Sequence, residues 1–99
     1  MVRDEVADGL RRYQQEKEGG RRLAWLKRLA PTRDVRVAVA LGEALDEPAG
    51  LLSGEAVVLL LAHYDIGPTS PLEDLSGAVR RWWKKNKTDL RRRAAQLPQ

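Results

Sequence analysis

The chain of 99 residues contains no cysteine, no phenylalanine and a single histidine, and its aromatic side chains are three tryptophans and two tyrosines. Without cysteine it can form neither a disulfide framework nor a thiolate metal site. The lone histidine, His63, cannot build a zinc site by itself. We therefore expect no bound metal and no cofactor. The lack of disulfides suits a reducing compartment.

Long apolar runs and targeting signals are also missing. The longest apolar run, residues 56–62, is far shorter than the roughly 20 residues that a membrane helix needs. The first ten residues are charged and polar, unlike a signal or transit peptide. We therefore expect a cytoplasmic protein with no membrane association. A chain of this length can bury one modest core, so we expect a single helical domain over residues 1–99.

No catalytic arrangement is recognisable in the sequence. Glu43, Asp46 and Glu47 gather at one predicted helix end and the following turn, where acids commonly serve as solvated charge. His63 and Asp65 would point about 160° apart on one helix, so Asp65 cannot orient the imidazole. The glycine-containing segments lack the spacing and the lysine of a phosphate loop. We therefore expect a protein that is not an enzyme.

Hydrophobic periodicity predicts helices and no convincing strand. The predicted helices span about residues 2–18, 21–30, 34–46, 54–66 and 71–95. Gly19-Gly20 is expected to end the first helix in the left-handed conformation, and Pro31 ends the second. Thr32 or Asp34 can cap the third helix, Ser53 the fourth and Ser70 the fifth.

Three features leave alternatives open. Residues 35–41 alternate as a strand would, and residues 57–62 would also suit a buried strand; helix is preferred for both. The segment 86–88 either continues the last helix or ends it, in which case Thr88 caps a sixth helix. Residues 94–99 are expected to form a frayed tail.

Two helices differ from the rest in their apolar pattern. Residues 54–66 are apolar all round, which is typical of a helix that other elements surround. Residues 2–18 carry only a narrow apolar stripe of Val2, Val6, Leu10 and Tyr13, which suggests a peripheral helix. The predicted fold is an all-α bundle of five helices, or six, around a central apolar helix at about 54–66.

The net charge of +4 hides a strong segregation of charge along the chain. Residues 21–33 carry five basic side chains and no acid, and residues 76–99 carry eight basic side chains and one acid. Between them, residues 34–75 carry one basic side chain and eight acids. Such a chain either binds a polyanion or pairs its own charges, within one molecule or between copies.

The most basic stretch is RRWWKKNKTDLRRR, residues 80–93, which contains two adjacent tryptophans. On one continuous helix, Trp82 and Trp83 share an arc of about 100° with Leu75, Val79 and Leu90, the width of a core-facing stripe. The basic residues fall on the opposite side. We therefore expect both rings to be core or core-edge residues rather than platforms for base stacking.

The sequence favours a small basic protein that binds DNA or RNA phosphates with little dependence on base sequence. The candidate contacts are basic residues of two predicted helices: Arg80, Arg81, Lys84, Lys85, Lys87, Arg91 and Arg92 on the last, and Arg21, Arg22, Lys27 and Arg28 on the second. They form one surface only if the two helices present them on the same side of the fold. The alternative is a protein-interaction or adaptor module that docks through the helix at 2–18 on a protein partner or on a second copy, with complementary acidic and basic surfaces.

Overall fold

The computed structural model describes residues 4–47, 51–66 and 74–98, and these residues are helical with no strand among them. The elements in chain order are α1 (Glu5–Gln15), α2 (Gly19–Leu29), the short 3-10 helix η1 (Ala30–Thr32), α3 (Val35–Leu45), α4 (Leu51–His63) and α5 (Leu75–Ala95). The prediction of an all-α bundle is confirmed. Residues 35–41 and 57–62 are helical, so the strand alternatives are wrong.

An acidic side chain caps each of four helices. Asp4 accepts from the Ala7 amide at 3.0 Å, and Asp34 accepts from the Arg36 amide at 2.9 Å. Glu18 accepts from the first amides of α2, and Asp74 from an amide in the first turn of α5. Each carboxylate satisfies a free N–H at the positive end of a helix dipole. Of the two predicted caps for α3, the structure selects Asp34.

The connection between α1 and α2 differs from the prediction. Gly19-Gly20 does not end the first helix; α1 ends at Gln15, and α2 begins at Gly19. No described glycine has a positive φ. The reason is the Glu18 carboxylate, whose two oxygens accept from the amides of Gly20 and Arg21 and so turn the glycine pair into a helix start.

The boundaries of α4 and α5 also differ from the prediction. Helix α4 begins three residues earlier than expected, so Ser53 is a buried residue inside the helix and not its cap. It ends at His63, and Asp65 takes the left-handed conformation at φ 47°. The expected start at Ser70-Pro71 lies outside the described residues. Asp74 has extended dihedral angles and caps α5, so the helix begins at Leu75.

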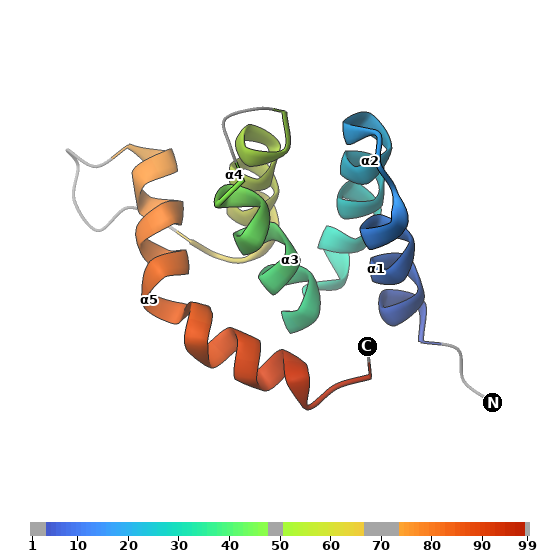
Figure 1. Cartoon of the computed structure of the whole chain (residues 1–99). Helices are drawn as coiled ribbons and strands as arrows, with labels where there is room; N and C mark the ends of the chain where they lie inside the picture. Colours follow the sequence, from blue (N-terminus) through green and yellow to red (C-terminus); the bar gives the residue numbers. More distant parts are fainter. Residues whose placement is uncertain (1–3, 48–50, 67–73, 99) are drawn as a thin grey trace.

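Helices α3 and α4 lie side by side in the middle of the bundle, between α5 on one side and α1 and α2 on the other (Figure 1). Helix α3 contacts α1, α2, α4 and α5, and α4 contacts α2, α3, η1 and α5. Side chains from all five helices join one core, whose largest fully buried members are Leu26, Val37, Leu41, Leu60 and Val79. Helix α4 leaves one side open, where Val58 is 56 % exposed. Helix α4 is therefore apolar on all sides, but its neighbours cover only some of them.

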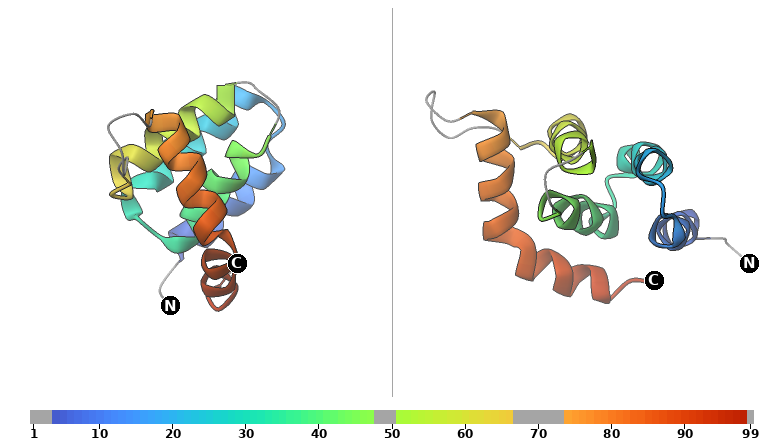
Figure 2. Two further views of the ribbon diagram at one scale, coloured as in Figure 1. Left: turned by 90° about the vertical axis from the view of Figure 1, so that its left-hand side faces the viewer. Right: turned by 45° about the horizontal axis from the view of Figure 1, so that its top comes forward.

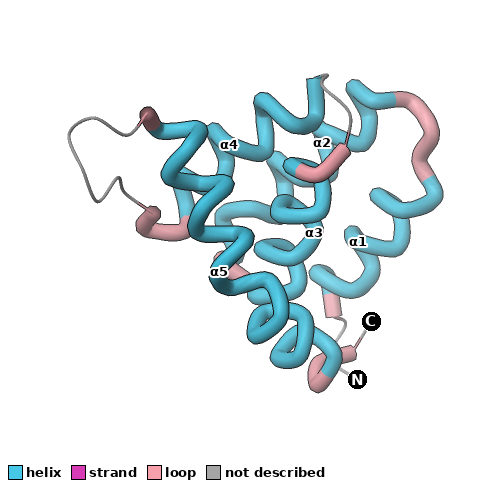
Figure 3. Tube along the Cα trace, turned by 60° about the vertical axis from the view of Figure 1, so that its left-hand side comes forward, coloured by secondary structure: helices cyan, strands magenta, loops and turns pink. Residues whose placement is uncertain are grey.

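Helix α5 is one helix that changes direction about midway and wraps around the outside of the bundle (Figures 2 and 3). No separate sixth helix begins at Thr88. Near the middle of α5, the Asn86 side chain donates to the Trp82 carbonyl at 2.8 Å. A side chain that competes for an i−4 carbonyl is a recognised cause of helix bending.

The described part of the tail after α5 contacts the rest of the bundle. Ala94 is buried, and the Pro98 carbonyl accepts a hydrogen bond from Arg36 Nη1. The Arg36 side chain, only 7 % exposed, also bonds Asp4 at 2.9 Å and Asp34 at 2.9 Å. One guanidinium thus joins the start of α1, the start of α3 and the C-terminal tail, and it brings Asp4 and Pro98 close together.

Candidate functional site

The two adjacent tryptophans of α5 belong to the interior, as predicted. Trp83 is 3 % exposed, and its Nε1 donates to Asp46 Oδ2 at 3.0 Å. Its six-membered ring lies directly against the backbone of Gly42. Trp82 is half-buried and packs against the core. The Trp83 ring is closed to solvent, whereas Trp82 keeps part of its surface exposed.

One row of basic residues on α5 meets the acidic end of α3. Arg80 Nη1 donates to the Leu45 carbonyl at 3.1 Å. Arg91 Nε lies 3.5 Å from Glu43 Oε1, and its guanidinium stacks on the Trp83 ring at 5.4 Å. Arg80 thereby stabilises the negative end of the α3 dipole. Part of the positive charge of α5 is therefore neutralised by the acidic segment of the same molecule.

Three lysines of α5 are not used in this way. Within the described ranges, Lys84, Lys85 and Lys87 make no hydrogen bond and no ion pair. Lys84 and Lys87 line a hollow of about 260 Å³ beside Asp46, Arg80 and Trp83. Lys85 is exposed, as is Arg81. Lys84 is also exposed, whereas Lys87 is half-buried on the side of the helix that faces α3. We refer to the basic residues Arg80, Arg81, Lys84, Lys85, Lys87, Arg91 and Arg92 together as the α5 basic face.

The second half of the α5 basic face carries its own acid. Asp89 Oδ1 lies 2.5 Å from Arg92 Nη2, and Asp89 Oδ2 lies 3.8 Å from Arg93 Nη1. All three side chains are more than half exposed. Exposed pairs of this kind contribute at most about 1 kcal/mol, so an external anion can replace Asp89 at little cost.

The three arginines of α2 each contact a different partner within the molecule. Arg22 donates to the Tyr13 hydroxyl at 3.0 Å and to Glu47 at 3.0 Å. Arg21 lies 3.9 Å from Glu16. Arg28 stacks on the Trp25 ring, and Lys27 is exposed. Helices α2 and α5 lie on opposite sides of the bundle, with α3 and α4 between them (Figures 1 and 2). The two predicted basic strips therefore do not form one surface.

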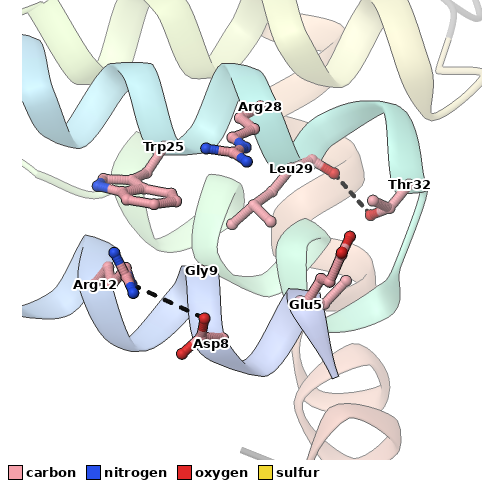
Figure 4. A pocket seen from close by; sticks show the side chains of 9 residues that line it. Glu5, Asp8, Gly9, Arg12, Trp25, Arg28, Leu29 and Thr32 are labelled. Carbon is pink, nitrogen blue, oxygen red and sulfur yellow. Dashed lines mark hydrogen bonds and ion pairs between the residues drawn. The ribbon is translucent and has the colours of Figure 1, made fainter. Parts of the chain in front are cut away.

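A pocket of about 230 Å³ lies between α1 and α2 (Figure 4). The guanidinium groups of Arg12 and Arg28 lie 5.7 and 5.5 Å from the centre of the Trp25 ring, and Figure 4 shows one below and one above it. Glu5 and Asp8 bring two acids to the same pocket. Its charges balance and its ring is covered, so it offers no clear preference for an anion or a cation.

The shifted pKa values among the described residues belong to groups that hold the fold together. The pKa of Asp34 lies below its usual value because Arg36 donates to its carboxylate, and the pKa of Asp4 is lowered for the same reason. Burial raises the pKa of Tyr13 and that of Tyr64. His63 is half-buried at the end of α4. Among the described residues, no group of His, Asp and Glu is placed to hold a metal ion.

Comparisons with models of known protein families, with curated proteins and with solved structures each gave no match. No helix in the described ranges combines the length and apolar character needed to cross a membrane. The candidate site therefore rests on the geometry of this chain. Of the predicted contacts, the structure gathers those on α5 and separates those on α2. The contacts of α3 with Arg80 and Arg91 were missed, because they join residues far apart in sequence.

Proposed function

We propose that this protein binds nucleic acid through the phosphate backbone, with the α5 basic face as the contact surface. The observation that carries the proposal is the cluster of Lys84, Lys85 and Lys87, which make no ion pair with any described residue. Long cationic side chains on one exposed helix face are the usual means of neutralising phosphates. The exposed Arg81 and Arg92 extend the cluster along the helix.

The shape of α5 favours contact with phosphates over base reading. A helix that reads a major groove lies along it as a straight rod with side chains at the base edges. Helix α5 is bent with its outer side convex (Figure 1), and its large aromatic rings face inward. Its outer side offers only long cations and a few small polar groups. Binding is therefore expected to be largely independent of base sequence.

The test is fluorescence anisotropy with labelled single-stranded and duplex DNA and RNA across a salt series. A slope of log K against log salt of about −4 or steeper on duplex would correspond to about four or more neutralised phosphates. In the variant Lys84→Gln/Lys85→Gln, the slope should become shallower by about 1.8 on duplex, because two contacts are lost. No binding at about 50 mM salt would refute the proposal.

A matched control separates location from net charge. The variant Lys17→Gln/Lys27→Gln removes the same charge from exposed positions near the ends of α1 and α2. It should bind almost as the unchanged protein does. Equal weakening by both pairs would mean that net charge attracts the polyanion and that α5 is not the contact surface.

A second candidate function is protein interaction, favoured by the open side of α4. Gly54, Val58 and Ala62 are exposed and follow one another at four-residue spacing, which places them in a row on the helix surface. The apolar stripe of the predicted helix at 2–18 is the other docking surface that the sequence suggests. Val2 lies outside the described residues, Tyr13 is buried, and Val6 and Leu10 are partly buried against the core. Light scattering over a concentration series, with Val58→Lys as the variant, tests self-association through α4.

A further inference from the structure

The middle of the α5 basic face carries one exposed hydroxyl, that of Thr88. Residues three and four positions away on a helix are its surface neighbours, with about 5–6 Å between Cβ atoms. For Thr88 all four of these neighbours are basic: Lys84, Lys85, Arg91 and Arg92. The hydroxyl therefore lies on the helix surface between four basic residues.

The Thr88 hydroxyl is available for an external partner. A threonine inside a helix often bonds the carbonyl four residues earlier. Within the part of the chain that the structure describes, the Thr88 hydroxyl makes no such bond and no other hydrogen bond. Thr32, by contrast, donates to the Leu29 carbonyl at 2.7 Å.

The surrounding cations are free or only loosely held. Lys84 and Lys85 make no ion pair with a described residue. Arg92 lies 2.5 Å from Asp89, and Arg91 lies 3.5 Å from Glu43. These pairs are exposed, and such pairs exchange readily with other anions.

We infer that one phosphate of the nucleic-acid backbone binds over Thr88, and this inference rests on the proposed function. One non-bridging oxygen accepts from Thr88 Oγ1. The charge of the phosphate is compensated by Lys84, Lys85 and Arg92, through charge-assisted hydrogen bonds. Threonine hydroxyls commonly supply such phosphate contacts. In the free protein, Asp89 forms an ion pair with Arg92 and therefore competes with the phosphate for this side chain.

The variant Thr88→Val removes the hydroxyl and keeps the branched shape and the charge. Its affinity for labelled single-stranded DNA should fall about threefold to tenfold. The salt slope should not change, because no cation is lost. Affinity equal to that of the unchanged protein would overturn the inference.

The variant Thr88→Glu places a negative charge among the four cations, and Ser76→Glu is its control. Ser76 is exposed on the same helix, about three turns earlier. Thr88→Glu should weaken binding more than tenfold and make the salt slope shallower by about 0.7 on single strands. Ser76→Glu should leave the slope unchanged. Equal effects of the two substitutions would contradict a phosphate site at Thr88.

The variant Asp89→Asn should tighten binding and make the salt slope steeper, because Arg92 and Arg93 are released. Glu5→Gln on α1 makes the same charge change at a distant exposed position and should do neither. If the unchanged protein binds no nucleic acid, the proposed function and this inference fail together. If it binds and Lys84→Gln/Lys85→Gln weakens it, but the Thr88 and Asp89 variants match their controls, only the inference fails.

Discussion

Gly42 of α3 and Trp83 of α5 are in direct contact, with the indole lying where a side chain on residue 42 would stand. A Cβ added at Gly42 would lie 2.3 Å from Trp83 Cε3, far inside van der Waals contact. The same indole donates to Asp46 one turn later on α3. This close approach fixes the height and rotation of α5 on the bundle, and with them the direction of the α5 basic face.

Gly42→Ala should destabilise the protein by about 1–3 kcal/mol. Alanine favours a helix by up to about 1 kcal/mol over glycine, but the clash with the indole costs more. Gly54→Ala is the control, because a Cβ there meets no atom within 4 Å. It should stabilise the protein by about 0.5–1 kcal/mol. Urea unfolding followed by circular dichroism measures both, and a gain for Gly42→Ala would show that the two helices separate easily.

Replacing the two adjacent tryptophans should have unequal effects. Trp83→Ala should cost about 3–5 kcal/mol, because the ring is buried against α3. Trp82→Ala should cost less, about 1–2 kcal/mol, because its ring is half-buried. Thermal unfolding at equal concentration compares the two. Equal costs, or lost nucleic-acid binding with an unchanged melting temperature, would mean that a ring assigned to the interior acts at the surface.

Arg36→Met should destabilise the protein by about 3 kcal/mol, the lower end of the range for breaking a buried ion pair. The guanidinium is 7 % exposed, but Asp4 is 35 % exposed. Water can therefore hydrate the Asp4 carboxylate once the guanidinium is gone, which keeps the cost at the lower end. Lys27→Met, at an exposed position, removes the same charge and should change stability by no more than about 0.5 kcal/mol. Hydrogen exchange would locate the effect of Arg36→Met at the starts of α1 and α3. Protection that is unchanged at both sites would contradict a joining role for Arg36.

Stability should fall on acidification through the same cluster. The pKa values of Asp4 and Asp34 lie below their ordinary value of 3.8 because Arg36 donates to both carboxylates. A carboxyl with a lowered pKa in the folded state contributes fully above the unfolded pKa. That contribution is lost as the pH falls through 3.8 towards the folded value. Urea midpoints between about pH 6 and pH 3 should drop less for Arg36→Met than for the unchanged protein, and parallel curves would argue against this assignment.

Local sequence rules predicted most of the helices because each has a strong local signal. Asp34 provides a cap for α3. Helix α2 ends close to Pro31 as predicted, but Ala30 before the proline stays helical, and the chain leaves helical geometry only at Arg33, after the 3-10 helix η1. The rules were wrong where two local signals competed. A glycine pair suits a helix end, but the Glu18 carboxylate made it a helix start. A serine suits a cap, but Ser53 was drawn into α4 and buried there.

The candidate site was predictable only in part. Periodicity placed Trp82 and Trp83 on the inner side of α5, opposite the basic residues, because spacing along one helix determines which residues share a face. The spacing around Thr88 carries the same kind of local information. The separation of the α2 and α5 basic residues could not be predicted, because it depends on how distant helices pack.

The sequence alone determined that this chain is helical, that Trp82 and Trp83 lie on the inner side of their helix and that its positive charge concentrates near the C-terminus. These properties follow from local spacing and composition. Only the tertiary structure decided that α3 and α4 separate α2 from α5. It also decided that Arg91 pairs with Glu43 and Arg80 with the Leu45 carbonyl, and that the side chains of Lys84, Lys85 and Lys87 remain without a described partner. Charges distant in sequence pair or stay free according to which helix ends the packing brings together.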